Sequence, residues 1–409
     1  MIIADIHIHS KYSRAASKNM DLDNLSEFAK IKGVDLLGSG DFTHFLWLQE
    51  LKTKLKEAGY GVYKYKGINY ILTVEVSNIY SYKGRVRKIH NLIIAPDFTA
   101  VDKINRELAK YGSLTADGRP TLSLDVRSLM EIVLSANSDC FLIPCHIWTP
   151  WFGLFGANSG FDSIEECFGP YVKDIYALET GLSSDPAMNW RISDLDRYTL
   201  VSNSDSHSPS KIGREANVLN ISMDYRELLE ALKNRDSGKF AYTIEFYPQE
   251  GKYHLDGHRG CGLSFSPKES MRLNNICPKC SKPLTIGVMH RVEELADRED
   301  GFMPKGAVGF KSLVPLDEII AELKGVQKTA KAVIVEYHSL IQSYGPELKI
   351  LSELDEKFLK NNLPVKIAKS IIAVREGRVK IKPGFDGLYG NVKVFDDKKM
   401  KSEKQLTFF

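Results

Sequence analysis

Short apolar runs alternate with longer amphipathic stretches over residues 1 to about 240. The first run, at residues 2–8, is short and rich in β-branched side chains, which is typical of a strand buried on both faces. Because successive side chains of a strand point to opposite faces, Asp5, His7 and His9 are expected on one side. Two imidazoles placed in this way can bind one divalent ion, although histidines facing water would give the same pattern.

Six further apolar runs have the same form, and each has a histidine or a carboxylate at one end. These residues are Asp41, Glu75, His90, His146, Glu179 and the pair Asp205 and His207. Helix-like stretches lie between the runs, at residues 22–31, 47–58, 101–111, 125–135 and 188–195. Strands that alternate with helices predict a parallel, barrel-like α/β domain. The ligands of such barrels bind where the strands end.

Length and composition limit the protein class. A chain of 409 residues is too long for one ordinary core, so two or three domains are expected. No apolar run reaches about 20 residues and no secretory leader is evident, so neither a membrane span nor export is expected. Six cysteines are too few for a disulfide scaffold and favour a reducing cytoplasm. The net charge of +3 permits binding of nucleic acid without requiring it.

Histidines gather at the ends of the apolar runs. Imidazoles and carboxylates crowded at one rim would be unfavourable without cations between them. A mixed ligand set suits Zn²⁺, Mn²⁺ or Fe²⁺, and a carboxylate such as Glu75 can bridge two ions. We therefore predict a centre that holds Zn²⁺, with Mg²⁺ or Mn²⁺ as alternatives at the catalytic positions. Its expected ligands are His7, His9, Asp41, Glu75, His90, His146, Asp205 and His207.

The order and spacing of these residues resemble the motifs of the polymerase-and-histidinol-phosphatase (PHP) superfamily of metal-dependent enzymes. The resemblance implies a distorted (β/α)₇ barrel with two or three ions that hydrolyses phosphoesters, with Asp205, Glu75, His207 and Asp41 as catalytic residues. The ligands expected for the first ion are His7, His9, Glu75 and Asp205, and those for the second are Glu75, His90 and His146. Asp41 and His207 would bind a third ion or position water. Superfamily members often have a histidine where this chain has Phe42, and His44 lies two residues further on, which leaves the third ion open.

Two closely spaced ligand pairs lie between residues 254 and 280. His258-x₂-Cys261 is followed by Cys277-x₂-Cys280, a spacing that predicts a structural zinc ribbon with four protein ligands. His254 is a second candidate for the histidine ligand. Basic residues surround the module, which favours contact with nucleic acid.

The segment at residues 179–191 turns through glycine and serine into a helix, so its backbone N–H groups are placed to bind a phosphate. An ordinary capped loop before Pro186 explains the same residues. We expect the following residues to contact DNA: Ser183, Asn189, Arg191, Lys211, Arg214 and Arg259.

The C-terminal part is predicted to be helical at residues 317–323, 329–344, 347–358 and 365–375. A basic and aromatic strip follows at 378–390 and suits either a DNA backbone or solvent. The charged tail, expected to be disordered, ends in two phenylalanines that resemble a compressed sliding-clamp-binding peptide. Its candidate contacts are Gln405, Leu406, Phe408 and Phe409. Packing of both rings on the helical domain is the alternative.

The barrel motifs, residues 179–191, the segment 256–259 with 277–280, and residues 291–298 together resemble the endonuclease Q family. That resemblance implies a DNA-repair enzyme that cuts the phosphodiester 5′ of a deaminated base (uracil, hypoxanthine or xanthine) or an abasic site. The expected units are a barrel at 1–240, a zinc module at 241–300, a helical DNA-binding domain at 301–395 and a tail at 396–409. A small-molecule phosphatase of the PHP type and a non-catalytic clamp adaptor that binds DNA are the alternatives.

Overall fold

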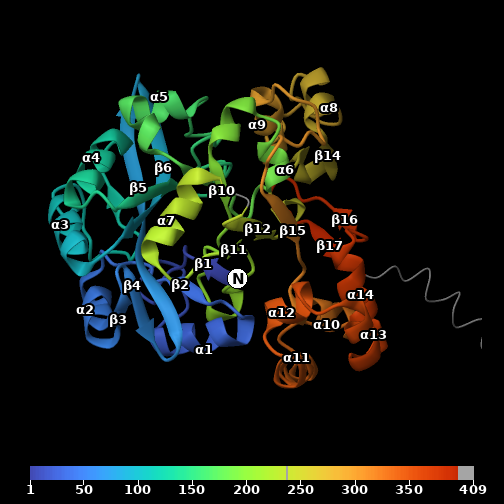
Figure 1. The fold of residues 1–409 in the computed structure, drawn as a ribbon. Helices are drawn as coiled ribbons and strands as arrows, with labels where there is room; N and C mark the ends of the chain where they lie inside the picture. The colour runs from blue at the N-terminus through green and yellow to red at the C-terminus, as the bar shows by residue number, and fades with distance from the viewer. Residues whose placement is uncertain (236–237, 395–409) are drawn as a thin grey trace, which may run out of the picture.

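The first strand, β1 (Ile2–Asp5), lies inside the largest sheet of the computed structural model, which describes residues 1–235 and 238–394 (Figure 1). It runs parallel to β2 (Leu36–Gly38) and antiparallel to β11 (Ala216–Leu219). All four residues of β1 are buried, as the apolar run predicts. The sheet therefore fixes the chain just before His7 and His9.

The main sheet is mixed, so the predicted α/β class is confirmed but the predicted parallel sheet is wrong. Its largest departure is a long antiparallel hairpin of β5 (Ile68–Tyr82) and β6 (Arg85–Ala95). Lys83 and Gly84 form the turn, both at positive φ, which matches the twist of a two-residue hairpin. The hairpin places Glu75 and His90 in the middle of strands and not at their ends.

The remaining strands continue around the same domain. β8 pairs antiparallel with β6, and β9 and β10 form a parallel pair beside β8. β12 pairs with β11 and, in parallel, with β15, which comes from the segment assigned to the helical unit. β4 pairs antiparallel with β5 and β3, and β7 pairs in parallel with β5. The strands whose bounds are not given above are β3 (Lys56–Gly59), β4 (Val62–Tyr65), β7 (Thr121–Leu122), β8 (Phe141–Pro144), β9 (Ala177–Glu179), β10 (Thr199–Val201), β12 (Phe240–Glu245) and β15 (Gly309–Ser312).

Helices lie around the outside of the sheet, and Figure 1 shows α2, α3 and α4 along its left side and α1 at the bottom. Several begin at an aspartate that caps the first turn, as Asp21 does by accepting the Asn24 N–H. The helices are α1 (Leu22–Lys32), α2 (Phe45–Lys54), α3 (Phe98–Leu108), α4 (Val126–Ala136), α5 (Ile164–Phe168), α6 (Pro186–Asn189) and α7 (Tyr225–Asn234). The helix predicted to reach residue 58 ends at Lys54, because residues 56–59 pair with β4.

The helix predicted at 188–195 is only the short α6 followed by a 3₁₀ turn, Ser193–Arg197. α6 ends at Asn189, and at the start of the 3₁₀ turn the Ser193 N–H donates to Asp297, from a distant segment, at 2.9 Å. Tertiary structure thus overrides the local helical pattern here.

Residues 1–240, which the sequence predicts to form a barrel, are called the barrel segment below, and two further groups of elements follow them. The first contains β13 (Asp256–His258), β14 (Leu263–Phe265), α8 (Pro267–Arg272) and α9 (Val288–Leu295). The second contains α10 (Leu316–Lys324), α11 (Lys331–Tyr344), α12 (Glu347–Ser352), α13 (Glu356–Asn362), α14 (Val365–Arg375), β16 (Lys380–Lys382) and β17 (Asn391–Lys393). The helix predicted at 365–375 is confirmed. The one predicted at 347–358 is two helices, because Asp355 caps a new helix by accepting the Phe358 N–H.

A buried polar contact joins α1 to the C-terminal helices. Lys32 forms an ion pair with Glu347, which also accepts the hydroxyl proton of Tyr337 at 2.5 Å. A buried charge needs such partners, so this contact fixes how the helical group meets the barrel segment. Within the described residues no helix has the length and apolar character to cross a bilayer.

Candidate metal centre

Four predicted ligands meet beside the end of β1. His7 and His9 follow that strand, Glu75 comes from the middle of β5, and Asp205 lies after β10. Their ligand atoms all lie within 4.8 Å of one another. His9 Nε2 is 3.1 Å from Glu75 Oε2 and 3.0 Å from Asp205 Oδ1.

The donor set fits a metal ion. His7 Nε2, His9 Nε2 and Asp205 Oδ1 are buried and have no hydrogen-bond partner, although they face one another. Buried polar atoms are nearly always paired, so three orphaned atoms at one point indicate a ligand that binds all of them. Two imidazoles and two carboxylates are a set that Zn²⁺ and Mn²⁺ accept.

A second set of ligands shares Glu75 with the first. His90 Nδ1 lies 2.5 Å from Glu75 Oε1, and His146 Nε2 lies 3.1 Å from the same oxygen. Glu75 thus turns one oxygen toward each set, the arrangement of a bridging carboxylate. Burial would raise the pKa of Glu75, but His90 and Arg119 outweigh it and hold that pKa well below its usual value.

Glu179, which we did not predict as a site residue, orients His7. It accepts the His7 Nδ1 proton at 2.9 Å and the Asn203 amide at 2.8 Å. Burial lowers the pKa of His7, but the Glu179 carboxylate more than compensates and raises it well above the usual value. A carboxylate on the outer nitrogen of a metal-binding histidine fixes its tautomer. Its place at the end of an apolar run was a signal for it.

Asp41 takes the same position behind His9, which corrects its predicted role as a ligand. Its Oδ1 accepts from His9 Nδ1 at 3.1 Å, and its Oδ2 accepts from the backbone N–H and the hydroxyl of Ser10, both at 2.6 Å. Both oxygens are therefore occupied, and Asp41 orients His9.

We find no third ligand set around Asp41 and His207 within residues 1–235 and 238–394. The His207 Nδ1–H donates to the Asp205 carbonyl at 2.9 Å, and the ring lies 4.4 Å from the His9 ring. The His44 ring stacks on Tyr12, with centroids 4.2 Å apart, so it does not replace the missing histidine. His207 is left beside the first set, where it contacts Asp205.

An unpredicted cation, Arg119, completes the centre. Its Nη1 donates to Glu75 Oε2 at 2.9 Å, and about a quarter of its side chain is exposed. Arginine binds phosphate oxygens through a planar fork of donors. Nothing in the sequence around residue 119 marks this position, because only the fold brings its loop to Glu75.

Two of the predicted DNA contacts are occupied within the protein. Asn189 is buried, accepts from Trp148 Nε1 at 2.8 Å and donates to the Asp185 carbonyl at 2.8 Å. Arg191 is nearly as buried and pairs with Glu293 at 2.6 Å. The prediction that Asn189 and Arg191 contact DNA is therefore wrong, and both support the loop after β9.

The other candidates are better placed. Ser183, Lys211 and Arg214 line a cleft of about 600 Å³ beside the strand ends, between the barrel segment, residues 248–254 and α10. The Arg214 guanidinium donates to the Ser204 carbonyl at 3.1 Å, next to Asp205. Arg259 is exposed on the zinc module. These four residues remain candidates for contact with DNA.

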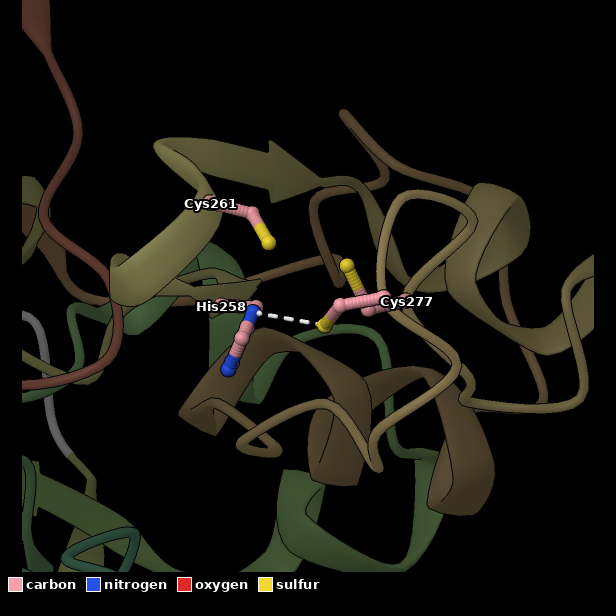
Figure 2. A group of neighbouring side chains, drawn as sticks. His258, Cys261 and Cys277 are labelled. Atoms are coloured by element: carbon pink, nitrogen blue, oxygen red, sulfur yellow. Dashed lines mark hydrogen bonds between the residues drawn. The ribbon is translucent and has the colours of Figure 1, made fainter.

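The predicted zinc ligands His258, Cys261, Cys277 and Cys280 lie together, with ligand atoms within 4.8 Å of one another. Figure 2 shows the labelled side chains pointing toward a common point. The described set includes His258 and not His254. Burial raises the pKa of Cys277, but the backbone N–H groups of Lys279 and Cys280 outweigh it and lower that pKa to about 6. A lowered pKa favours the thiolate that binds zinc.

Comparison with known proteins identifies the family. The model of the MJ0043 C-terminal domain family matches residues 315–378. A crystal structure of the lesion-specific endonuclease Q of Pyrococcus furiosus has a TM-score of 0.87 and 31% identity, over 98% of both chains. A structure of endonuclease Q with a 27-mer duplex that carries an abasic lesion at the active site has a TM-score of 0.85 and 31% identity, again over 98% of both chains. The chain belongs to the endonuclease Q family.

Two curated relatives of this chain are named as uncharacterized proteins. The YqxK protein of Bacillus subtilis is 29% identical over 96% of this chain and 99% of its own length. The MJ0043 protein of Methanocaldococcus jannaschii is 33% identical over 60% of this chain but only 31% of its own length. The full-length likeness to endonuclease Q confirms the resemblance that the barrel motifs and the zinc-ligand spacing predicted.

Proposed function

We propose that the chain is a metal-dependent DNA-repair endonuclease that hydrolyses the phosphodiester 5′ of a deaminated base or an abasic site. The observation that carries this proposal is the bridging position of Glu75 between two buried ligand sets. It occurs in a chain that resembles, over its full length, an endonuclease Q solved with a lesion-containing duplex.

The strands around the centre support a barrel. Neighbouring strands follow one another in the order β1, β2, β5, β6, β8, β9 and β10. β11, which pairs with β1, also contacts the chain after β10, because Asn217 accepts the Ser202 N–H at 2.9 Å, and this contact closes the circuit. We infer that this circuit is the distorted (β/α)₇ barrel of the PHP type. The loops after β1, β8 and β10 then meet at one rim.

His7, His9, Glu75 and Asp205 would hold one ion, and Glu75, His90 and His146 a second. When bound, the ions would lower the pKa of a water that attacks phosphorus and would stabilise the charge of the transition state. The protein orients the ligands: Glu179 and Asp41 keep a proton on the outer nitrogens of His7 and His9, so the inner nitrogens are free to bind metal. Zn²⁺ would occupy the Cys₃His cluster, and Zn²⁺, Mn²⁺ or Mg²⁺ the centre.

Arg119 is the cation placed to contact the scissile phosphate, since it is partly exposed beside the shared ligand. Replacing Arg119 with Ala is expected to lower kcat by about 10²-fold, as loss of one transition-state donor commonly does. Arg119→Lys should recover part of that loss, because it restores charge but not the two-pronged geometry.

Rates under single turnover, together with the metal content of each variant, would test this role. Arg106→Ala removes an exposed arginine from α3 and is the matched control. A wild-type rate in Arg119→Ala with unchanged metal content would contradict the assignment.

The zinc module and the helical group would supply the surface for DNA, with Ser183, Lys211, Arg214 and Arg259 as contacts. The base is expected to leave the duplex, because its altered atoms face the pairing partner. Comparing hydrolysis of a uracil-containing duplex with that of a phosphomonoester tests the proposal against a small-molecule phosphatase. Preference for the phosphomonoester would overturn it, and hydrolysis of neither would favour the DNA-binding adaptor.

The predicted clamp contacts, Gln405, Leu406, Phe408 and Phe409, lie outside the described residues. We propose that the two rings insert into a pocket of the replication clamp and carry most of a modest affinity. Deleting residues 404–409 should then abolish the heat of clamp binding in a calorimetric titration and leave nicking of a short lesion duplex unchanged. Unchanged clamp binding, or a lower melting temperature, would favour packing of the rings on the chain itself.

A further inference from the structure

Three aromatic side chains border the cleft beside the metal centre. Tyr253 and Tyr389 line it, and the Trp151 ring stands edge-on to Tyr253, with centroids 5.9 Å apart at 70°. Trp151 is 47% exposed and Tyr389 is 77% exposed. The neighbours of Trp151 on its loop, Thr149 and Pro150, line the same cleft. An exposed aromatic group at the mouth of a cleft indicates a binding surface.

The loop that carries Trp151 is attached to a metal ligand. The Phe152 ring lies 4.5 Å from the His90 ring, and the His90 N–H donates to the Phe152 carbonyl at 2.9 Å. Phe152 has φ +67°, a conformation that bulky residues rarely adopt and keep only where the surrounding structure holds them in it. The constraint on Phe152 holds Trp151 next to the centre with almost half of its surface facing solvent.

Cations accompany these rings. The Lys252 ammonium lies 5.6 Å from the Tyr253 ring and 5.8 Å from the Tyr389 ring, and Lys88 lies 5.5 Å from the Phe152 ring. Flat aromatic faces interspersed with lysines are the pattern that binds nucleic acid, because the bases stack on the rings while the lysines neutralise phosphates. A nucleobase of the DNA strand is therefore the occupant that this surface fits.

We propose that Trp151, supported by Tyr253, stacks on a nucleobase that flanks the lesion and thereby replaces the stacking lost when the lesion nucleotide leaves the duplex. The inference rests on the proposed function, since it takes a lesion-containing duplex as substrate. Trp151 acts as a positioning residue: it holds the opened duplex so that the phosphate reaches the metal centre. The need for it should be largest in duplex DNA, where flanking bases lose a partner.

The test compares Trp151→Ala and Trp151→Phe with the wild-type enzyme loaded with metal. The first substrate is a uracil duplex with 2-aminopurine next to the uracil, and the second is the same strand without its complement. Tyr60→Ala is the control, because Tyr60 is an exposed aromatic residue far from the proposed contact. Its hydroxyl donates a hydrogen bond to Asp139, which precedes β8, whereas the candidate ligand His146 lies at the other end of that strand.

We expect Trp151→Ala to lower kcat/KM on the duplex by about 5- to 150-fold, the equivalent of about 1–3 kcal/mol for one stacked base. The loss on the single strand should be much smaller, and Trp151→Phe should recover most of the duplex activity. The 2-aminopurine fluorescence change that accompanies binding of wild-type enzyme should disappear in Trp151→Ala and persist in Tyr60→Ala.

If the wild-type enzyme nicks the duplex and Trp151→Ala nicks it at the same rate, this inference is overturned and the proposed function stays intact. An equal loss on duplex and single strand would also overturn it, because that result indicates a contact that does not replace duplex stacking. Failure of wild-type enzyme to nick the duplex would instead remove the proposed function. Melting temperatures within a few degrees of wild type would show that the variants are folded.

Discussion

Asp205→Asn and Glu75→Gln are each expected to lower the single-turnover nicking rate by about 10³-fold or more, the equivalent of about 4 kcal/mol of activation free energy. Both substitutions keep the shape of the side chain and remove its negative charge. Asp205 has a buried oxygen without a hydrogen-bond partner in the first ligand set, and Glu75 is shared by both sets. Loss of either carboxylate should weaken metal binding and the activation of water.

The rate should be measured with saturating enzyme on a lesion duplex, beside the metal content and the melting temperature. Glu57→Gln, an exposed change on β3, is the matched control and should behave as wild type. We expect Glu75→Gln to lose more metal than Asp205→Asn, because it contributes to two sets. A folded Glu75→Gln enzyme with a near-native rate would remove Glu75 from the mechanism.

Cys277→Ser and Cys280→Ser are expected to remove one zinc per chain and to unfold the module around residues 250–300. Serine keeps the size of cysteine but does not supply the thiolate that zinc binds. A closed structural site contributes folding free energy directly, so hydrogen exchange at α8 and α9 should accelerate strongly while exchange at β1 and β5 changes little. In these variants, affinity for a lesion duplex should fall more than the maximal nicking rate does.

Cys140→Ser makes the same chemical change in the barrel segment and should keep the zinc. The module also contacts the barrel segment, because Arg291 on α9 donates to the Phe155 carbonyl at 3.1 Å. A modest loss of barrel stability is therefore expected in the two zinc-ligand variants. Unchanged zinc content and unchanged hydrogen exchange in Cys277→Ser would show that the cluster is not a structural zinc site.

The sequence was most informative where one local pattern determines the structure. The run before His7 forms a buried strand, as a short run rich in isoleucine predicts for a strand covered on both faces. Helix α14 has the predicted bounds because Pro364 precedes it and Gly377 follows it. Within each x₂ pair, His258–Cys261 and Cys277–Cys280, the two ligands lie close because a knuckle closes within a few residues.

Prediction from the sequence failed where contacts between segments far apart in the chain determine the role of a side chain. A carboxylate at a strand end can bind a metal or orient a histidine. The sequence does not distinguish Asp205, which lies in a candidate ligand set, from Asp41 and Glu179, which contact the outer nitrogens of His9 and His7. Arg119 reaches Glu75 from a loop 44 residues further along the chain. The β5–β6 hairpin was missed because charged residues in β6 interrupt its apolar pattern. Asn189 and Arg191 are polar, yet the fold buries them.

The central claim is tested most directly by mapping the cut in matched duplexes. Two end-labelled duplexes that differ only in a uracil or a cytosine at one position should be incubated with enzyme, with chelator, and with chelator followed by Mn²⁺ or Zn²⁺. We predict a single nick immediately 5′ of the uracil, no nick at the cytosine, loss of nicking with chelator and its return with added metal. Equal cutting of both duplexes, or cutting that persists without metal, would contradict the account.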